Sequence, residues 1–512
     1  MINLLPVKRA LISVYDKSNL IELVKVLEKF GIEIYSSGGT FEFLKNNFLN
    51  IKPLSEISGI SSLLDGRVKS LHPLVHAAIL ARKDSEKHLN ELREAGVEPF
   101  DLVIVNFYPF ERVVEKENIS ELEVIENIDI GGPTLIRSAA KNYESVVVVS
   151  SINQYDYLIK ELREHNGSTT VDFRRMLAAE AFQRIVEYDI AISRYFSKEV
   201  NLNLTLPLEK VLRYGENPHQ SAKLYGNFLK IFQPIHGKEL SYNNILDIVS
   251  AAELVFEFDK CACAIIKHNS PCGVALGNSV QEAFEKALRS DSISAFGGIV
   301  AFNQKVDKQT AEKLNEIFLE VIIAPEFQDD ALEVLKKKKD RRLILVDKNF
   351  KEKKSFLSKN EIRSIPNGLL VQSKDKIVIN KDELEFVTYQ RPDENELEDL
   401  IFAFTVAKYV RSNAIVFARN GLTLGIGGGQ TSRVDAVKIA IMKAREFNHN
   451  LENSVVASDG FFPFADSVEI AHKAGAKSFI QPGGSVRDTE VIKFANDNNL
   501  KMVLTKIRHF KH

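Results

Sequence analysis

Several building blocks are scarce in this 512-residue sequence, which has no tryptophan and only four methionines. There are three cysteines, an odd number in a long chain, which argues against a framework of disulfide bonds. The longest apolar runs, such as Val146 to Val149, are far too short to cross a bilayer. The amino terminus has neither an uninterrupted apolar core nor a small-residue cleavage site, so we expect no signal peptide.

Neither sign of charge dominates. Lysine plus arginine number 67 and aspartate plus glutamate number 69, which gives a formal net charge of −2. A protein that binds nucleic acid through bulk positive charge is therefore not expected. Hydrophobic residues make up 45% of the chain and charged residues 27%, a globular composition that excludes disorder over the whole chain. We expect a cytoplasmic protein with no membrane and no nucleic-acid partner.

The first 200 residues predict alternating strands and helices. Apolar strands are predicted at 10–14, 32–36, 101–107 and 145–150. Helical spacing of apolar residues is found over 20–30. A second helix is predicted to open within 128–134, with proline in its first turn, and to end near Lys141, and a further helix is expected to begin at Phe41. This order is typical of a parallel α/β layer.

The sequence pattern changes near residue 200, because 201–207 has no helical period and contains a proline. We place a domain boundary there, between 1–198 and 199–512. The second part again mixes strands and helices, with a strand at 261–268 and a strand and turn at 415–424. A charged segment at 336–354 is interpreted as a solvated joint between two subdomains.

Glycine-rich turns precede three predicted helices, at 37–40, 131–134 and 427–433. Free N–H groups at a helix N-terminus attract anions, so each turn is a candidate phosphate site, with a plain tight turn as the alternative. Arg67 and Lys69 share one side of an extended chain, next to Ser70. Two cations and a hydroxyl suit a phosphate, although a solvated edge has the same composition.

Lys267 and His268 end an apolar strand and lead into a polar turn, where open α/β sheets bind ligands. The alternative is a structural pair at a strand end. Cys261 and Cys263 lie on one face of that strand, and Cys272 follows it. The zinc deaminase pattern H-x-E…P-C-x-x-C is incomplete here, so the cysteines are interpreted as structural and metal-free.

Longer motifs cover the whole chain. They are SVYDK (13–17), SSGGT (36–40), GRVKSLHP (66–73), NFYPF (106–110), IDIGGPT (128–134), LRYGENPHQ (212–220), IKHNSPCG (266–273), SAFGG (294–298), GIGGGQTSR (425–433), DGFFPFADS (459–467) and IRHF (507–510). Together they closely resemble the bifunctional purine-biosynthesis family that joins inosine monophosphate (IMP) cyclohydrolase to aminoimidazole carboxamide ribonucleotide (AICAR) formyltransferase.

The resemblance implies an enzyme with two reactions, the last two steps of de novo IMP biosynthesis. The C-terminal part would transfer a formyl group from the co-substrate 10-formyltetrahydrofolate to the 5-amino group of AICAR. The N-terminal part would close formyl-AICAR to IMP with loss of water. The implied activities are those of a transferase and of a hydrolase of the cyclohydrolase type.

The resemblance also implies an α/β fold and an assembly. Residues 1–198 would form a methylglyoxal-synthase-like parallel-sheet domain. Residues 199–512 would form a pair of cytidine-deaminase-like α/β subdomains without zinc, joined at roughly 335–385. The family acts as a homodimer with the transferase sites at the interface. No catalytic metal is implied, and a structural monovalent cation is compatible with the family.

The resemblance also implies roles for residues of the cyclohydrolase half. The nucleotide and phosphate pocket is matched by Lys17, Ser37, Gly38, Gly39, Thr40, Arg67, Lys69 and Ser70. The groups around the reacting formyl and carboxamide are matched by Lys69, Tyr108, Asp129 and Lys141. A lysine can donate to a developing oxyanion, and an aspartate can accept a proton. Ser70 stands where the family more often has threonine, and the hydroxyl is kept.

In the transferase half, His268 would accept the proton as the amine attacks, Lys267 would stabilise the oxyanion, and Asn413 would hold the formyl oxygen or the base. Substrate contacts are matched by Arg213, Asn244, Phe296, Glu320, Arg433, Phe461, Asp466 and Arg508. Glu320 stands where some members have aspartate, so the carboxylate is kept on a longer side chain.

Two other classes of function are weighed against this one. The N-terminal fold also occurs as a phosphate-binding regulatory module, which would make the chain a monofunctional transferase with an allosteric domain. The presence of Lys69, Tyr108, Asp129 and Lys141 argues against that class. A deaminase is disfavoured by the incomplete zinc pattern.

Overall fold

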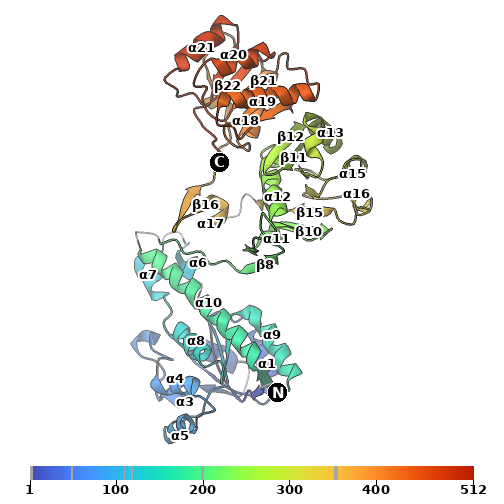
Figure 1. Ribbon diagram of the computed structural model, residues 1–512. Helices are drawn as coiled ribbons and strands as arrows, with labels where there is room; N and C mark the ends of the chain where they lie inside the picture. Colours follow the sequence, from blue (N-terminus) through green and yellow to red (C-terminus); the bar gives the residue numbers. More distant parts are fainter. Residues whose placement is uncertain are drawn as a thin grey trace. The chain divides into compact units, whose positions relative to one another are not determined.

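The computed structural model describes residues 4–47, 50–108, 110–114, 116, 119–197, 201–350 and 356–512. The chain divides into two compact units, Met1–Thr205 and Leu206–His512, which are coloured along the sequence in Figure 1. Within the described residues, no helix has both the length and the apolar character needed to cross a membrane.

A parallel sheet forms the centre of the first unit. Its strands are β2 (Arg9–Val14), β3 (Glu33–Ser36), β4 (Ile51–Pro53), β5 (Leu102–Asn106) and β6 (Val147–Val149). Their order is β4-β3-β2-β5-β6, and all neighbours are parallel. The order reverses between β2 and β5, which leaves a ligand-binding crevice at the carboxyl ends of these two strands.

Helices cover this sheet. They are α1 (Leu20–Lys29), α2 (Gly38–Lys45), α3 (Ser55–Ser58), α4 (Pro73–Leu80), α5 (Glu86–Glu94), α6 (Phe110–Val114), α7 (Glu121–Glu126), α8 (Gly131–Lys141), α9 (Tyr155–Glu164) and α10 (Val171–Phe196). α1 packs against α9, and α8 packs against both α4 and α10. A short antiparallel pair, β1 (Leu4–Pro6) with β7 (Ser168–Thr170), lies outside the main sheet. The predicted parallel α/β layer is confirmed, although α2 begins at Gly38 rather than at Phe41.

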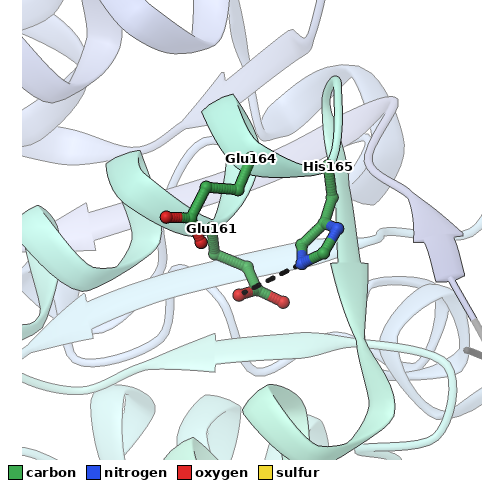
Figure 2. Close-up of side chains that lie close together, drawn as sticks. All are labelled: Glu161, Glu164 and His165. Carbon is green, nitrogen blue, oxygen red and sulfur yellow. Dashed lines mark ion pairs between the residues drawn. The ribbon is translucent and has the colours of Figure 1, made fainter.

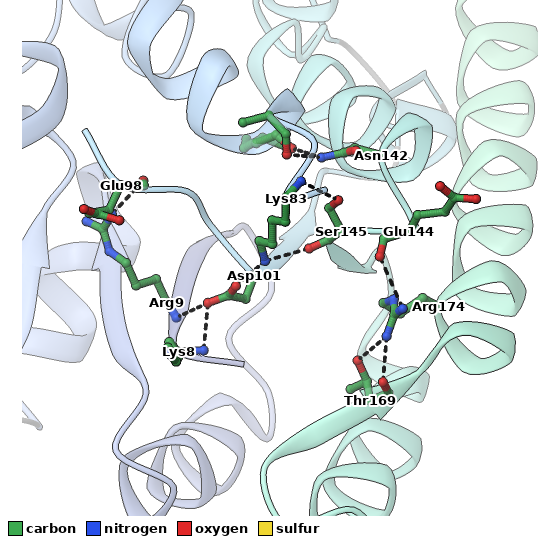
Figure 3. Close-up of polar contacts among 12 residues, drawn as sticks. Lys8, Arg9, Lys83, Glu98, Asp101, Asn142, Glu144, Ser145, Thr169 and Arg174 are labelled. Carbon is green, nitrogen blue, oxygen red and sulfur yellow. Dashed lines mark hydrogen bonds and ion pairs between the residues drawn. The ribbon is translucent and has the colours of Figure 1, made fainter. Parts of the chain in front are cut away.

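Buried polar contacts hold the segments at the amino ends of strands β2, β5 and β6 (Figure 3). The Asp101 carboxylate accepts hydrogen bonds of 2.7 Å from two backbone amides at the start of β2, and it pairs with the Lys83 ammonium. The guanidinium of Arg174, on α10, is buried and donates to the Thr169 carbonyl at 2.6 Å and to the Tyr143 carbonyl at 2.9 Å. Because buried charges are costly unless they are paired and hydrogen-bonded, these contacts serve the fold.

The second unit contains a large mixed sheet built from two halves with the same topology. The first half has β11 (Ala262–Lys267), β12 (Ser270–Leu276), β13 (Ile299–Phe302), β14 (Val321–Ala324) and β15 (Arg342–Val346). The second has β19 (Ile415–Arg419), β20 (Leu422–Gly427), β21 (Val455–Ser458), β22 (Ser478–Gln481) and β23 (Lys501–Leu504). In each half the first strand pairs antiparallel with the next two, and the last three strands are parallel.

The two halves join through β12 and β20, where Ala275 pairs with Leu422. The edge strands are β10 (Phe232–His236) and β18 (Glu385–Phe386), which complete a sheet of 12 strands among the described residues. Two hairpins lie apart from it: β8 (Leu208–Leu212) with β9 (Ala222–Tyr225), and β16 (Asn360–Ile365) with β17 (Gly368–Ser373). β15 falls inside the charged segment 336–354, yet it is a sheet strand between β10 and β14.

Helices of the second unit pack on both halves, apart from α17, which contacts β16 of the separate hairpin (Figure 1). They are α11 (Phe228–Ile231), α12 (Tyr242–Val255), α13 (Val280–Ser290), α14 (Ser292–Ala295), α15 (Lys308–Asn315), α16 (Asp329–Leu335), α17 (Phe356–Lys359), α18 (Glu394–Ala407), α19 (Arg433–Glu446), α20 (Asp466–Lys473) and α21 (Asp488–Asp497). Gly425 and Gly427 belong to β20 and not to a loop. A Cβ on Gly427 would lie 1.9 Å from the Ala436 carbonyl oxygen, so glycine is needed for α19 to pack on β20.

Candidate active sites

The crevice of the first unit is lined by the loops that follow β2, β3 and β5. Asn106, the last residue of β5, fixes the loop after β2, because its side chain accepts from the Asp16 amide and donates to the Asp16 carbonyl, both at 2.9 Å. Tyr108 packs edge-on against Tyr15 with ring centroids 4.4 Å apart. In the same loop Lys17 donates to the Tyr15 carbonyl at 3.2 Å. Asn106 was given no role in the sequence analysis, although it is a polar residue at the end of an apolar strand and the first residue of NFYPF (106–110).

The glycine turn before α2 lies beside Lys69. Lys69 Nζ is 3.5 Å from the position that a Cβ would occupy on Gly38, which has a left-handed φ of 53°. Ser37 is the N-cap of α2, and its side chain makes no capping hydrogen bond. Thr40 is different, because its buried hydroxyl accepts from the Val14 amide at 3.0 Å and donates to the Val14 carbonyl at 2.8 Å. The turn and Lys69 together suit an anion, whereas Thr40 ties α2 to β2.

Asp129 precedes α8, and both its carboxylate and its backbone amide are hydrogen-bonded. Its Oδ1 accepts from the Gly132 amide at 2.9 Å, and its own amide donates to the Tyr188 hydroxyl at 2.7 Å. Burial raises the pKa of this carboxyl, and the Lys69 ammonium acts in the opposite direction. Ser70 is buried next to Gly131, with Oγ 2.8 Å from the position of a Cβ there. The structure therefore gathers Lys69, Ser70 and Asp129 around one end of α8.

No contact from Arg67 or Lys141 to Lys69, Ser70 or Asp129 is found among the described residues. Arg67 is engaged by Glu126, with Nε 3.2 Å from Oε2. Lys141 is the last residue of α8, so the helix separates it from the Asp129 end by about 15 Å at about 1.5 Å per residue. Lys141 instead lines a groove of about 550 Å³ together with Arg137 and Arg175.

The first predicted transferase cluster lies at the end of β11. Lys267 Nζ donates to the Phe296 carbonyl at 2.9 Å. Asn244, on α12, donates to Glu320 Oε2 at 3.1 Å. A cavity of about 230 Å³ opens beside Lys267 and His268. The cavity supplies room for a small group next to a cation and an imidazole.

Cys272 also lines this cavity. Burial raises the pKa of its thiol to about 12, so it is not a ready nucleophile. Cys261, Cys263 and Cys272 are all free, in agreement with the prediction that they form no disulfide.

The second predicted transferase cluster lies where β19 begins and β21 ends. Arg433 is buried and pairs with Asp459 at 2.5 Å, and it donates to Asn413 Oδ1 at 2.8 Å. Phe461 lies just after β21 and is partly exposed. The remaining predicted contacts lie in three places, with Asp466 at the start of α20, Arg508 after β23 and Arg213 after β8.

The two clusters share one edge of the large sheet. The strand directions place the end of β11 and the starts of β13 and β14 on the same edge as the start of β19 and the end of β21. β12 and β20 lie between β11 and β19, which separates the clusters by about 14 Å at about 4.8 Å per strand step. Asp247 and Asp459 contact the predicted residues but were not assigned roles from the sequence. Asp247 belongs to none of the motifs, whereas Asp459 is the first residue of DGFFPFADS (459–467).

One group of metal-ligand side chains stands out among the described residues. Glu161, Glu164 and His165 at the end of α9 have ligand atoms within 4.8 Å of one another (Figure 2). Glu161 Oε1, however, accepts from both the amide and the hydroxyl of Thr170 at 2.7 Å, next to the start of α10. The group contains none of the predicted site residues, and we assign no metal to it.

Comparison with known proteins defines the class. A family model described as the AICARFT/IMPCHase bienzyme matches residues 139–443, and an MGS-like domain model matches residues 19–134. The chain therefore belongs to the AICARFT/IMPCHase bienzyme family, with an MGS-like domain in its N-terminal part. The predicted family and the α/β fold class are confirmed.

The curated relatives are bifunctional purine biosynthesis proteins named PurH. The protein of Caldicellulosiruptor saccharolyticus is 48% identical over 99% of this chain and 100% of its own length. That of Clostridium botulinum is 48% identical with the same coverage, and that of Persephonella marina is 47% identical with the same coverage.

Proposed function

We propose that this chain catalyses the last two steps of IMP biosynthesis, formyl transfer to AICAR followed by ring closure of formyl-AICAR. The observation that carries the proposal is the full-length match, at 47–48% identity, to bifunctional PurH proteins. A monofunctional transferase with a regulatory first unit would not need a lysine ammonium that acts on the Asp129 carboxyl. The electrostatic influence of Lys69 on the pKa of Asp129 supports a catalytic first unit.

In formyl transfer, the AICAR amine attacks the formyl carbon, the bond from that carbon to the folate nitrogen breaks, and a proton passes from the amine to the leaving nitrogen. We assign His268 as the group that accepts the amine proton and Lys267 as the donor to the oxyanion. The Lys267 ammonium has three N–H groups, and the Phe296 carbonyl accepts one of them. The others are available to the oxyanion beside the cavity.

In ring closure, the carboxamide nitrogen attacks the formyl carbon and water leaves. Asp129 is assigned as the proton acceptor and Lys69 as the donor to the oxygen that departs. A raised pKa suits a carboxyl that must take up and release a proton. The glycine turn 37–40 would bind the phosphate under the Lys69 ammonium. The assignment of the two reactions to 1–198 and 199–512 is part of this proposal.

The transferase site is proposed to be completed by a second copy of the chain. Reacting atoms must approach within about 3–3.5 Å, yet the two clusters of one chain lie about 14 Å apart along the sheet edge. Apolar side chains of the β16–β17 hairpin are exposed in the single chain, which supports a contact with another copy: Ile365, Leu369, Leu370 and Val371. The folate co-substrate and the homodimer both belong to this proposal.

The activity test uses the full chain with AICAR and 10-formyltetrahydrofolate. IMP should form, and formyl-AICAR supplied alone should also give IMP. Accumulation of formyl-AICAR without IMP would indicate the monofunctional transferase, and release of ammonia without formyl transfer would indicate a deaminase.

Mixing two inactive variants tests the shared site. If each site takes His268 from one chain and Arg433 from the other, a mixed dimer of His268→Ala and Arg433→Ala has one intact site. Random exchange should then restore about a quarter of wild-type transfer. Sites built within single chains would give no recovery.

A further inference from the structure

The turn that carries His268 has a constrained backbone. β11 and β12 are antiparallel neighbours in which Lys267 pairs with Ser270, so His268 and Asn269 form a two-residue hairpin loop. Both have positive φ, 53° at His268 and 60° at Asn269. Positive φ at both central positions is the pattern of a type I′ turn, which favours Asn-Gly. Histidine and asparagine adopt positive φ more readily than other residues that have a Cβ, but less readily than glycine, so contacts around this loop help to hold it.

That support comes from one face of α12. Asp247 Oδ1 accepts a hydrogen bond of 2.6 Å from the Asn269 amide, and the Ser250 hydroxyl donates to Asn269 Oδ1, also at 2.6 Å. Asn244 lies three residues before Asp247 on the same face and contacts Glu320. One helix face therefore reaches both the turn with the proposed base and a predicted substrate-binding carboxylate.

The groups around Asp247 shift the pKa of its carboxyl in opposite directions. Burial raises the pKa of its carboxyl, and the nearby Glu320 carboxylate acts in the same direction. The amides of Asn269 and His268 and the His268 side chain act in the opposite direction. Asp247 is therefore partly withdrawn from water and faces the backbone of the turn rather than an ion-pair partner.

We propose that Asp247 is a positioning residue for formyl transfer, whose carboxylate holds the His268–Asn269 turn in its left-handed conformation and so keeps the His268 imidazole beside Lys267. This inference rests on the proposed role of His268 as the base. Asp247 itself moves no proton of the reaction. Its effect is geometric, because a misplacement of about 1 Å at a reacting group can cost about 10²-fold in rate.

The first test removes the Asp247 carboxylate and then stabilises the turn by a second substitution, at Asn269. Asp247→Ala should lower kcat for formyl transfer by about 10–100-fold and leave KM for AICAR within about threefold. Adding Asn269→Gly to that variant should restore at least about tenfold, because glycine adopts positive φ without steric cost and is the preferred second residue of a type I′ turn. The exposed Asp259→Ala is the control for loss of one negative charge.

Cyclisation of supplied formyl-AICAR and thermal unfolding are measured on the same full-length sample as formyl transfer. They show whether the variant is folded and whether transfer alone is affected. A wild-type kcat in folded Asp247→Ala, or a double variant no faster than Asp247→Ala, would overturn the inference. If Asp247→Ala does not fold, Asp247→Asn replaces it, since the amide oxygen can still accept from the Asn269 amide. That variant should stay within about tenfold of wild type, and a larger loss would also overturn the inference. Normal transfer by His268→Ala would instead contradict the proposed function.

Discussion

Arg433 joins Asn413 to Asp459 at the edge of the large sheet. Its Nη2 donates to Asn413 Oδ1 at 2.8 Å, while Nη1 pairs with Asp459 Oδ1 at 2.5 Å and donates to the Ser458 hydroxyl at 2.7 Å. The Asn413 amide group also donates to the Gln430 carbonyl at 2.9 Å. The Asn413 carbonyl oxygen is thus already bonded, so a contact from Asn413 to the formyl oxygen would come from its remaining N–H.

Asp459→Ala should destabilise the second unit. Arg433 and Asp459 are both buried, and removal of one partner leaves an uncompensated charge, which typically costs about 3–5 kcal/mol. Formyl transfer should fall in the folded fraction, because Arg433 loses the contact that orients it toward Asn413. Urea unfolding and transfer rates measure both effects. Asp435→Ala, which breaks an exposed pair with Lys438, is the control and should change the free energy of unfolding by less than about 1 kcal/mol.

Lys69→Ala should damage cyclisation selectively. The variant loses the ammonium over the glycine turn next to Asp129, and one such donor is typically worth about 10²–10³-fold in rate. Formyl transfer should continue, so formyl-AICAR should accumulate when both substrates are supplied. Lys25→Ala, at an exposed position of α1, should behave as wild type. Equal loss of both activities in Lys69→Ala would contradict its assignment to one site.

Local pattern was enough to predict the parallel layer of the first unit. The apolar strands end in polar turns, and the buried positions Leu20, Leu23, Val24 and Leu27 of α1 follow the helical period. The same reasoning misjudged glycine. Gly427 was predicted to begin a glycine-rich turn, but it is a strand residue that, like Gly425, leaves room for α19, and that requirement exists only once helix and strand are packed.

The residues around the sites were harder to predict. Asp247 acts on the backbone of a turn 22 residues further along the chain, and a lone aspartate gives no spacing signal. Asp459 opens the motif DGFFPFADS, but its ion pair with Arg433 exists only in the folded chain. Lys141 shows the opposite problem. It is only 12 residues from Asp129 in the sequence, yet it lies at the far end of α8, because separation in sequence becomes axial distance along a helix.

His268→Ala should damage formyl transfer selectively. The attacking amine is attached to an electron-poor ring and is a weak nucleophile, so a positioned base should contribute about 10²–10⁴-fold. Cyclisation of supplied formyl-AICAR should be unaffected. If His268 only shapes the hairpin turn, the variant would be less stable but would transfer normally once folded. Transfer, cyclisation and thermal unfolding measured on one sample decide between these outcomes.

Asp129→Asn should raise the stability of the folded chain at neutral pH and lower the rate of cyclisation. Burial raises the pKa of Asp129 above its ordinary value of 3.8, so the folded chain binds this proton more tightly than the unfolded chain does. Stability is therefore lost as the pH rises from about 3.8 through the raised pKa, and the penalty is complete above it. Asparagine carries no such proton, and its Oδ1 can still accept from the Gly132 amide. The variant should be more stable than wild type at pH 7, and this difference should vanish as the pH falls well below 3.8, while cyclisation falls by about 10²–10⁴-fold. Thermal unfolding of the full chain across this pH range gives the stability difference, and a variant less stable than wild type at pH 7 would contradict the expected sign.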